Sequence, residues 1–331
     1  MNINFKKMFV TILMVTLVSV LAACSDGANS APNYPDEDIT VIQGFDPGGG
    51  SDQLAQVTQP YLQENLGVSF NNEYIPGSAG AIGWTRVAQQ SPNDGYTISI
   101  TNGPMLMTNY LMNDEISYSL EDFEPIANVV TDPGVIVVPA DSEFETYEEF
   151  ANYLSENPGD LTASNSGVGG DDFFTQLKWM EESGLDMELI PYDGDGPSWQ
   201  AAAGGDVDVS FNNLGVVYQQ IQEGNLRALA VFSEERIEMV PDVPTASELG
   251  LDVVSGSSRG YSAPADIPEE AKERLIEAFA QLEDNEEFQE DLDNLALPMD
   301  LKLGDEYAEY LEEEEKTSAD LWEEVKDQYE Q

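Results

Sequence analysis

The sequence predicts an α/β fold with two lobes, each built on a doubly wound sheet that is rich in parallel strands. The 331 residues are enough for two sizeable hydrophobic cores. Segments with strand character alternate with segments that have the apolar spacing of helices, which is the order of a parallel sheet covered by helices. Two apolar, extended segments, 126–130 and 135–138, are suited to cross from one lobe to the other.

The first part of the chain contains three predicted strands, at 39–42, 68–74 and 96–100. A glycine-rich turn and then a helix-like segment follow each of the first two strands. The repeated order of strand, turn and helix predicts parallel neighbours in one sheet.

The later part of the chain repeats this order. Thr146 and Glu149 form a predicted capping box for a helix that continues through Leu154. Further strands are predicted at 161–165, 187–192, 207–211 and 226–231. A last strand at 258–264 is expected to return between the lobes.

The C-terminal part is expected to be helical from Pro268 to the end of the chain. Its apolar residues recur at helical spacing. The acidic run Glu312 to Glu315 is interpreted as the solvated surface of the last helix.

The N-terminus reads as an export signal. Lys6 and Lys7 precede an apolar run that ends in small residues before Cys24, the only cysteine in the sequence. This run is shorter than the roughly 20 apolar residues of a membrane-spanning helix. The segment resembles a bacterial lipoprotein box, in which the cysteine thiol carries a lipid; a chance cysteine is the alternative. We therefore predict the following parts: a signal peptide at 1–23, a lipidated tether at 24–33, a first lobe at 34–132 and 257–331, and a second lobe at 133–256.

The composition excludes several classes of function. The chain has 12 Lys and Arg against 64 Asp and Glu, a net charge of −52 at pH 7, so nucleic acid is not an expected partner. Self-repulsion of this size favours expansion in dilute buffer, whereas about 1 M salt, with a Debye length of about 3 Å, screens most of it. The charge therefore indicates a saline habitat. The sequence has no histidine, which excludes His-based triads and the commonest zinc ligand, and we expect no metal and no cofactor.

Two glycine-rich turns, 44–52 and 166–172, each stand between a predicted strand and a predicted helix. Glycines let backbone N–H groups converge, and the helix end adds partial positive charge, so such a turn can bind an anion without a basic side chain. A tight turn without any ligand is an equally good interpretation of either one alone. Neither has the spacing of a nucleotide-binding motif.

Short motifs occur along the chain in a characteristic order. They are Phe45 to Asp52, Pro76-Gly77-Ser78-Ala79-Gly80, Asp94-Gly95-Tyr96-Thr97, Pro191-Tyr192-Asp193-Gly194, Gly204-Gly205-Asp206-Val207-Asp208, Leu226 to Val231, Arg236 with Pro241 to Thr245, Glu248-Leu249-Gly250, and Ala263-Pro264. In this order they resemble the Bug family, the substrate-binding proteins of tripartite tricarboxylate transporters. The resemblance runs from about Tyr34 to the C-terminus. It implies a two-lobed, type II-like periplasmic-binding-protein fold with the ligand in a cleft between the lobes.

By this resemblance, the two glycine-rich turns hold a ligand carboxylate from opposite lobes. The implied ligand-binding residues are Phe45, Gly48, Gly49, Ser51 and Asp52 in the first lobe, and Ser164, Ser166, Gly167 and Gly169 in the second. Asp52 has helix capping as its alternative role. Asn102 and Asn212, at strand ends, are expected to face the same cleft, and a turn-forming role fits each of them equally well.

The chain departs from the family's pattern at four positions. Asp46 and Pro47 stand where the family has small residues, and Asp171 and Asp172 stand where it has hydroxyl residues. We expect Asp46 and Asp171 to point to solvent. The alternatives are that they meet an amino or hydroxyl group of the ligand, or hold a cation. If they face the cleft, an amino or hydroxy acid fits better than a bare tricarboxylate.

The sequence thus predicts an exported, lipid-anchored, monomeric protein that binds a small organic anion by hinge closure. Its partners would be the permease subunits of a tripartite tricarboxylate transporter, on the outer face of the cytoplasmic membrane. We expect no catalysis. Three alternatives remain open: a sensory receptor subunit with the same binding site, an extracellular hydrolase that uses a carboxylate pair, and an adhesive surface protein.

Overall fold

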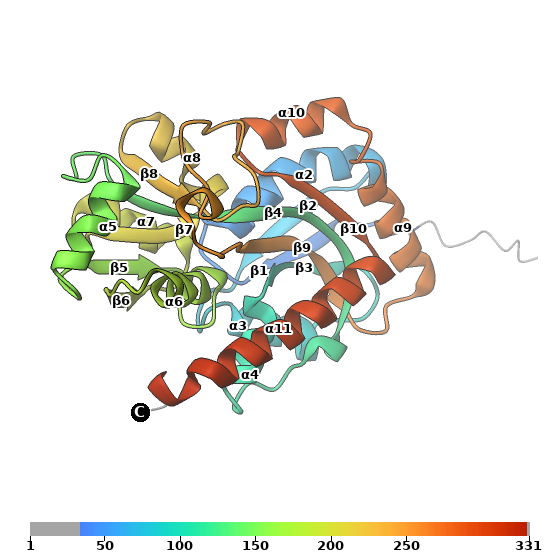
Figure 1. The fold of residues 1–331 in the computed structure, drawn as a ribbon. Helices are drawn as coiled ribbons and strands as arrows, with labels where there is room; N and C mark the ends of the chain where they lie inside the picture. Colours follow the sequence, from blue (N-terminus) through green and yellow to red (C-terminus); the bar gives the residue numbers. More distant parts are fainter. Residues whose placement is uncertain (1–33, 330–331) are drawn as a thin grey trace, which may run out of the picture.

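The computed structural model describes residues 34–329, which form two α/β lobes side by side (Figure 1). The predicted signal peptide, Cys24 and the tether lie outside these residues. The predicted α/β, two-lobed fold class is confirmed. The exact lobe boundaries stay a prediction.

Within residues 34–329, the first lobe contains six strands of the sheet, two of them at its crossing with the second lobe. Its elements are β1 (Ile39–Gln43), α2 (Gly50–Leu66), β2 (Phe70–Tyr74), α3 (Ala81–Gln90), β3 (Thr97–Gly103), α4 (Met105–Met112), η1 (Leu120–Asp122), the first part of β4 (Phe123–Pro139), β9 (Gly256–Pro264), α9 (Glu269–Ala280), α10 (Glu286–Asn294), β10 (Met299–Leu303) and α11 (Asp305–Tyr329). The strand order is β2-β1-β3-β9-β4, and β10 also pairs with β4.

The second lobe continues the same sheet through β7, β5 and β6. Its elements are α5 (Tyr147–Glu156), β5 (Thr162–Asn165), α6 (Asp171–Ser183), β6 (Glu188–Pro191), α7 (Asp195–Gly204), β7 (Val209–Asn213), α8 (Leu214–Gln222), β8 (Leu226–Val231) and η2 (Ser247–Leu249). Strand β5 runs parallel to both β6 and β7, whereas β7 and β8 run antiparallel to β4.

Helices cover both faces of the sheet in each lobe. In the first lobe, buried side chains of α2, α9 and α10 pack on one face, and those of α3, α4 and α11 pack on the other (Figure 1). In the second lobe, α5 and α6 lie opposite α7 and α8. Each lobe therefore has its own three-layer core, which makes it a rigid half of the molecule.

Two strands connect the lobes. The predicted segments 126–130 and 135–138 are parts of one 17-residue strand, β4, which pairs with β9 and β10 in its first part and with β7 and β8 in its last part. Strand β9 returns beside it, antiparallel, as the sequence predicts. Because both connecting segments are single extended strands, the connection between the lobes is narrow.

One sequence prediction was wrong in this part of the molecule, and two features were not predicted. The sheet is mixed, because β9 and β10 run antiparallel to β4. The C-terminal part is not all helical, since β10 interrupts it; the alternation of Met299, Leu301 and Leu303 with polar residues is a strand signal that the acidic helices around it obscured. Helix α4 follows directly on β3 and was not predicted.

Candidate functional site

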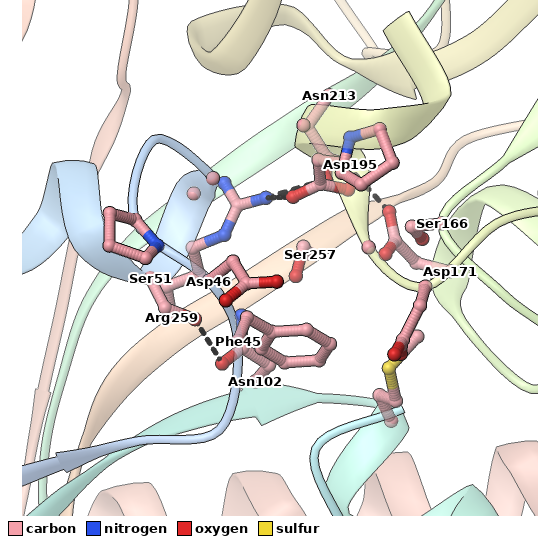
Figure 2. Close-up of a pocket in the computed structure, with 18 of the residues that line it drawn as sticks. Phe45, Asp46, Ser51, Asn102, Ser166, Asp171, Asp195, Asn213, Ser257 and Arg259 are labelled. Carbon is pink, nitrogen blue, oxygen red and sulfur yellow. Dashed lines mark hydrogen bonds and ion pairs between the residues drawn. The ribbon is translucent and has the colours of Figure 1, made fainter. Parts of the chain in front are cut away.

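A cavity of about 230 Å³ lies between the lobes, beside the two crossing strands (Figure 2). The lining residues from the first lobe are Phe45, Asp46, Pro47, Gly49, Gly50, Ser51, Asn102 and Met105. Strand β9 contributes Ser257 and Arg259. The second lobe contributes Ser166, Asp171, Asp193, Gly194, Asp195, Gly196, Pro197, Gln200 and Asn213. The volume suits a small ligand of a few heavy atoms.

The N-terminal end of α2 faces this cavity. Gly48 has a left-handed φ of 92°, which brings the glycine turn around to the helix, and its N–H donates to Oδ2 of Asp52 at 2.8 Å. Tyr74 donates to the other oxygen of Asp52 at 2.7 Å. The N-cap, Gly49, places no side-chain cap on the helix. The carboxylate of Asp52 therefore fixes the turn, and the first amides of α2 meet the cavity without a side chain over them.

A buried side-chain pair supports the same wall of the cavity. Ser51, in the first turn of α2, donates from Oγ to Oδ1 of Asn102 at 2.8 Å. Asn102 lies near the end of β3 and is 7% exposed. This bond holds the side-chain amide of Asn102 at the cavity wall beside the helix end.

Two helices begin at the opposite wall of the cavity, and the first residue of each is an aspartate. Asp171 is the first residue of α6, and it accepts a hydrogen bond from Nδ2 of Asn213 at 2.7 Å. Asp195 is the first residue of α7, and it lies 3.3 Å from Nη2 of Arg259. An acid at a helix N-terminus interacts favourably with the helix dipole. Both helix ends of the second lobe therefore already carry a negative group.

Arg259 is the basic residue of the cavity, and sequence reasoning missed it. Its guanidinium forms a short ion pair with Asp132 on β4 and donates to Oδ1 of Asn213 at 2.6 Å. It also contacts Asp195 (Figure 2). The side chain is 1% exposed, and Nε has no hydrogen-bond partner among residues 34–329. A Cβ at Gly50 would overlap the guanidinium, so only glycine fits at that position without a shift.

These ionisable groups perturb one another strongly. Burial raises the pKa of Asp171 to about 7, with a further contribution from Asp195. Burial, and then the charge of Asp171, holds the pKa of Asp172 well above its usual value. Burial opposes the charge of Arg259, but Asp132 and Asp195 outweigh it and raise the pKa of the guanidinium.

The two lobes touch on both sides of the cavity. Gln53 on α2 donates to the carbonyl of Gly215 in the second lobe at 2.9 Å. On the other side, Oγ1 of Thr108 on α4 donates to the carbonyl of Gly169 at 2.6 Å. The lobes are therefore in direct contact beside the cavity.

Five of the predicted binding residues line the cavity: Phe45, Gly49, Ser51, Asn102 and Ser166. The other six do not: Gly48, Asp52, Ser164, Gly167, Gly169 and Asn212. Gly48 and Asp52 shape the turn behind the helix end. Ser164 is buried against Ser198, and Gly169 contacts Thr108 on the far side of the turn. Gly167 borders a separate groove, and Asn212 is buried in β7 one position before Asn213, which does line the cavity.

The expectation that Asp171 points to solvent was wrong. Asp171 is 7% exposed and faces the cavity, whereas Asp46 borders the cavity and remains exposed. The expectation that no basic side chain serves the site also needs correction, since Arg259 lies in its wall. One signal was present in the sequence: Arg259 is the one charged residue of 256–264, a strand expected to cross between the lobes, and a charge buried there needs a charged partner.

Within the acidic run on α11, Glu312 and Glu313 are exposed as expected, but the interpretation of the run as solvated surface was wrong for Glu314, which reaches the back of the site. The carboxylate of Glu314 packs against the backbone of Gly103 and accepts from Oγ of Ser258 at 3.1 Å. Burial raises its pKa from 4.5 to about 8, and the charge of Asp171 adds to the effect.

We expect Glu314→Gln to flatten the pH dependence of stability. A carboxyl whose pKa is raised in the folded state stabilises the protein below its unfolded value of 4.5, and this contribution is lost as the pH rises to about 8. At pH 9 the free energy of unfolding of the variant should therefore exceed that of the parent by about 1–2 kcal/mol, a value reduced for the partial exposure of Glu314. Denaturant titrations at pH 6 and pH 9 measure this. The exposed neighbour Glu313→Gln is the control, and equal pH slopes for both variants would contradict the assignment.

No helix within residues 34–329 combines the length and apolar character that crossing a membrane requires. No group of three or more acidic or cysteine side chains there is arranged to hold a metal ion.

Comparison with known proteins identifies relatives across most of the chain. Residues 54–326 match the family described as the tripartite tricarboxylate transporter family receptor. BugT of Bordetella pertussis is 32% identical over 223 residues, which cover 67% of this chain and 68% of that protein.

Solved structures give the same result. The periplasmic binding protein BugD superposes with a TM-score of 0.81 at 26% identity, covering 88% of this chain and 98% of its own. MatC from Rhodopseudomonas palustris, solved with bound malate, gives a TM-score of 0.79 at 25% identity, covering 87% and 99%. The superpositions therefore cover nearly the whole of each solved chain.

Proposed function

The chain belongs to the tripartite tricarboxylate transporter receptor family, and from that premise we propose that its cavity captures a small carboxylic acid outside the cytoplasmic membrane. The ligand class is a di- or tricarboxylate, an amino acid or a hydroxy acid. The closed protein then delivers the ligand to the permease of a tripartite transporter. The lobes hold the ligand without changing it.

One observation carries this proposal: the uncapped N-terminus of α2 opens into a small cavity enclosed by both lobes. Its amides and the amide of Asn102 supply hydrogen-bond donors at the place where a carboxylate would sit. The malate in MatC shows that a protein of this fold and size can hold a carboxylic acid. Ligand release requires the lobes to separate, and the two extended crossings, β4 and β9, provide the hinge.

The remaining predictions from the sequence are part of the same proposal. Cys24 would carry the lipid that holds the protein at the outer face of the membrane, since two acyl chains give stable anchoring. Residues 24–33 would be the tether. The first lobe would comprise 34–132 and 257–331, and the second lobe 133–256. The protein would act as a monomer. The net charge of −52 would adapt the protein to a saline medium.

We expect the purified protein to bind at least one acid of a panel of di-, tri-, amino and hydroxy carboxylic acids in molar salt, with a stoichiometry of one. Isothermal titration calorimetry measures this. Gly50→Ala should weaken binding by about tenfold or more, because the new Cβ pushes the guanidinium of Arg259 out of the cavity wall.

Gly204→Ala is the matched control, since an added Cβ there meets only ordinary contact at 3.9 Å and lies outside the cavity. Absence of saturable heat for every acid would overturn the proposed function. Equal affinity in the Gly50 and Gly204 variants would mean that the ligand lies elsewhere.

A further inference from the structure

We propose that the ligand of this cavity is a zwitterion, a small molecule with one carboxylate and one ammonium group, and not a di- or tricarboxylate. This inference rests on the proposed function and names its substrate class. It follows from which charges line the cavity and from which of them are already paired.

The cavity wall is acidic. Four carboxylates line it, from Asp46, Asp171, Asp193 and Asp195, against the single guanidinium of Arg259. That guanidinium is shared with a further carboxylate behind the wall, Asp132. Asp46 and Asp193 are exposed, whereas Asp171 is buried and Asp195 is half-buried, so a ligand with two or three negative charges would meet its strongest, least screened repulsion from Asp171 and Asp195.

The cavity offers one place for a carboxylate and not two. Three helices begin at its wall, α2, α6 and α7. None of the three has a side-chain cap. Helices α6 and α7 begin with Asp171 and Asp195, which line the cavity, whereas the first acid of α2, Asp52, accepts hydrogen bonds from Gly48 and Tyr74 and does not line it. A second carboxylate on the ligand would therefore meet a carboxylate at either helix end of the second lobe.

Arg259 does not supply the missing positive site for a second carboxylate. Nη1 is bound to Asp132, and Nη2 is bound to Asn213 and Asp195. Nε remains without a hydrogen-bond partner among the described residues, next to Gly50 at the start of α2. This buried donor therefore adds to the one carboxylate site at α2 and creates no other.

The opposite wall suits a cationic group. Figure 2 shows Asp171 and Asp195 together across the cavity from Ser51 and Asn102. An ammonium placed between these two carboxylates would pair with charges that otherwise repel each other. The ligand's carboxylate and ammonium would then point to opposite lobes, so that closing the lobes satisfies both.

This arrangement predicts the direction of proton transfer on binding. The pKa of Asp171 is raised to about 7 by burial and by Asp195. The charged groups that face it are Asp172, Asp195, Asp132, Arg259 and Glu314, from helices α6, α7 and α11 and strands β4 and β9. An ammonium lowers the pKa of Asp171, so a zwitterion releases protons near pH 7, whereas a diacid takes them up.

The test uses pairs of ligands that differ in one group: β-alanine and succinate, γ-aminobutyrate and glutarate, L-alanine and methylmalonate. Titration calorimetry in 2 M NaCl at pH 7, in two buffers of different ionisation enthalpy, gives affinity and proton release together. We expect the amino member to bind about tenfold or more tightly in at least one pair, with release of protons. Tighter binding of the diacids would overturn this inference and leave the proposed function standing, whereas no binding of any acid would overturn both.

Three substitutions then locate the cationic site. Asp171→Asn, Asp193→Asn and Asp195→Asn should each weaken the amino ligand, and Asp195→Asn should also strengthen the diacid, because it frees Arg259. Asp242→Asn, an exposed residue outside the cavity, is the control for net charge. Circular dichroism in 2 M NaCl checks that each variant folds, and Asp193, which makes only a 3.4 Å contact with the N–H of Ala79, is the variant least coupled to folding. Unchanged affinities in all three variants would overturn the inference.

Discussion

Replacing Arg259 with methionine is expected to lower the free energy of unfolding by about 3–5 kcal/mol. Asp132 is fully buried, and burial already raises its pKa in spite of the guanidinium. Without its partner, the carboxylate would have to take up a proton or remain as an uncompensated buried charge. The effect is large because Arg259 also joins β9 to the second lobe through Asp195 and Asn213.

Denaturant unfolding in molar salt measures this loss. The double variant Arg259→Met, Asp132→Asn should recover part of it, since neither side chain is then charged. The control is Arg236→Met, which breaks an ion pair with Glu248 whose side chains are 44% and 46% exposed and should cost less than about 1 kcal/mol. If the Arg259 and Arg236 variants lose similar stability, the buried ion pair does not hold the lobes together.

Transfer from 2 M to 0.1 M NaCl is expected to lower the melting temperature by roughly 10 °C or more. The chain carries 64 acids against 12 bases, and 20 of the acids fall between residues 281 and 331. Several lie exposed on α11, where like charges on successive turns repel each other. At low salt this repulsion acts over about 10 Å, and ligand affinity should fall together with stability.

Circular dichroism across a salt series measures the shift. A variant with four exposed acids of α11 neutralised, Glu306→Gln, Glu309→Gln, Glu312→Gln and Glu313→Gln, should melt higher than the parent at 0.1 M and show a smaller salt dependence. Sucrose, which stabilises proteins without screening charge, is the control for effects other than screening. Equal melting temperatures at both salt concentrations would contradict the electrostatic explanation.

The succession of strands, turns and helices along the chain could be predicted from the sequence. The strand 39–43, the glycine turn and helix α2 follow from residues that are adjacent in the chain, and so does the anion-binding character of that helix end. The segments 126–130 and 135–138 of the first crossing were predicted from their apolar, extended character, and the return crossing was predicted at 258–264. Membership of the receptor family followed from the order of short motifs.

Contacts between distant residues were decided by the tertiary structure alone. Arg259 meets Asp132 across 127 residues and Asp195 across 64, and no local pattern specifies that these three groups converge on one cavity. In the same way, Glu314 looks like one more solvated acid until α11 packs it against Gly103 and Ser258. The sequence determined where amides could bind an anion, since that depends on backbone geometry within a single turn. The charge of the opposite wall depends on which side chains folding buries together and which counter-charges they find there, and only the packed lobes settle that.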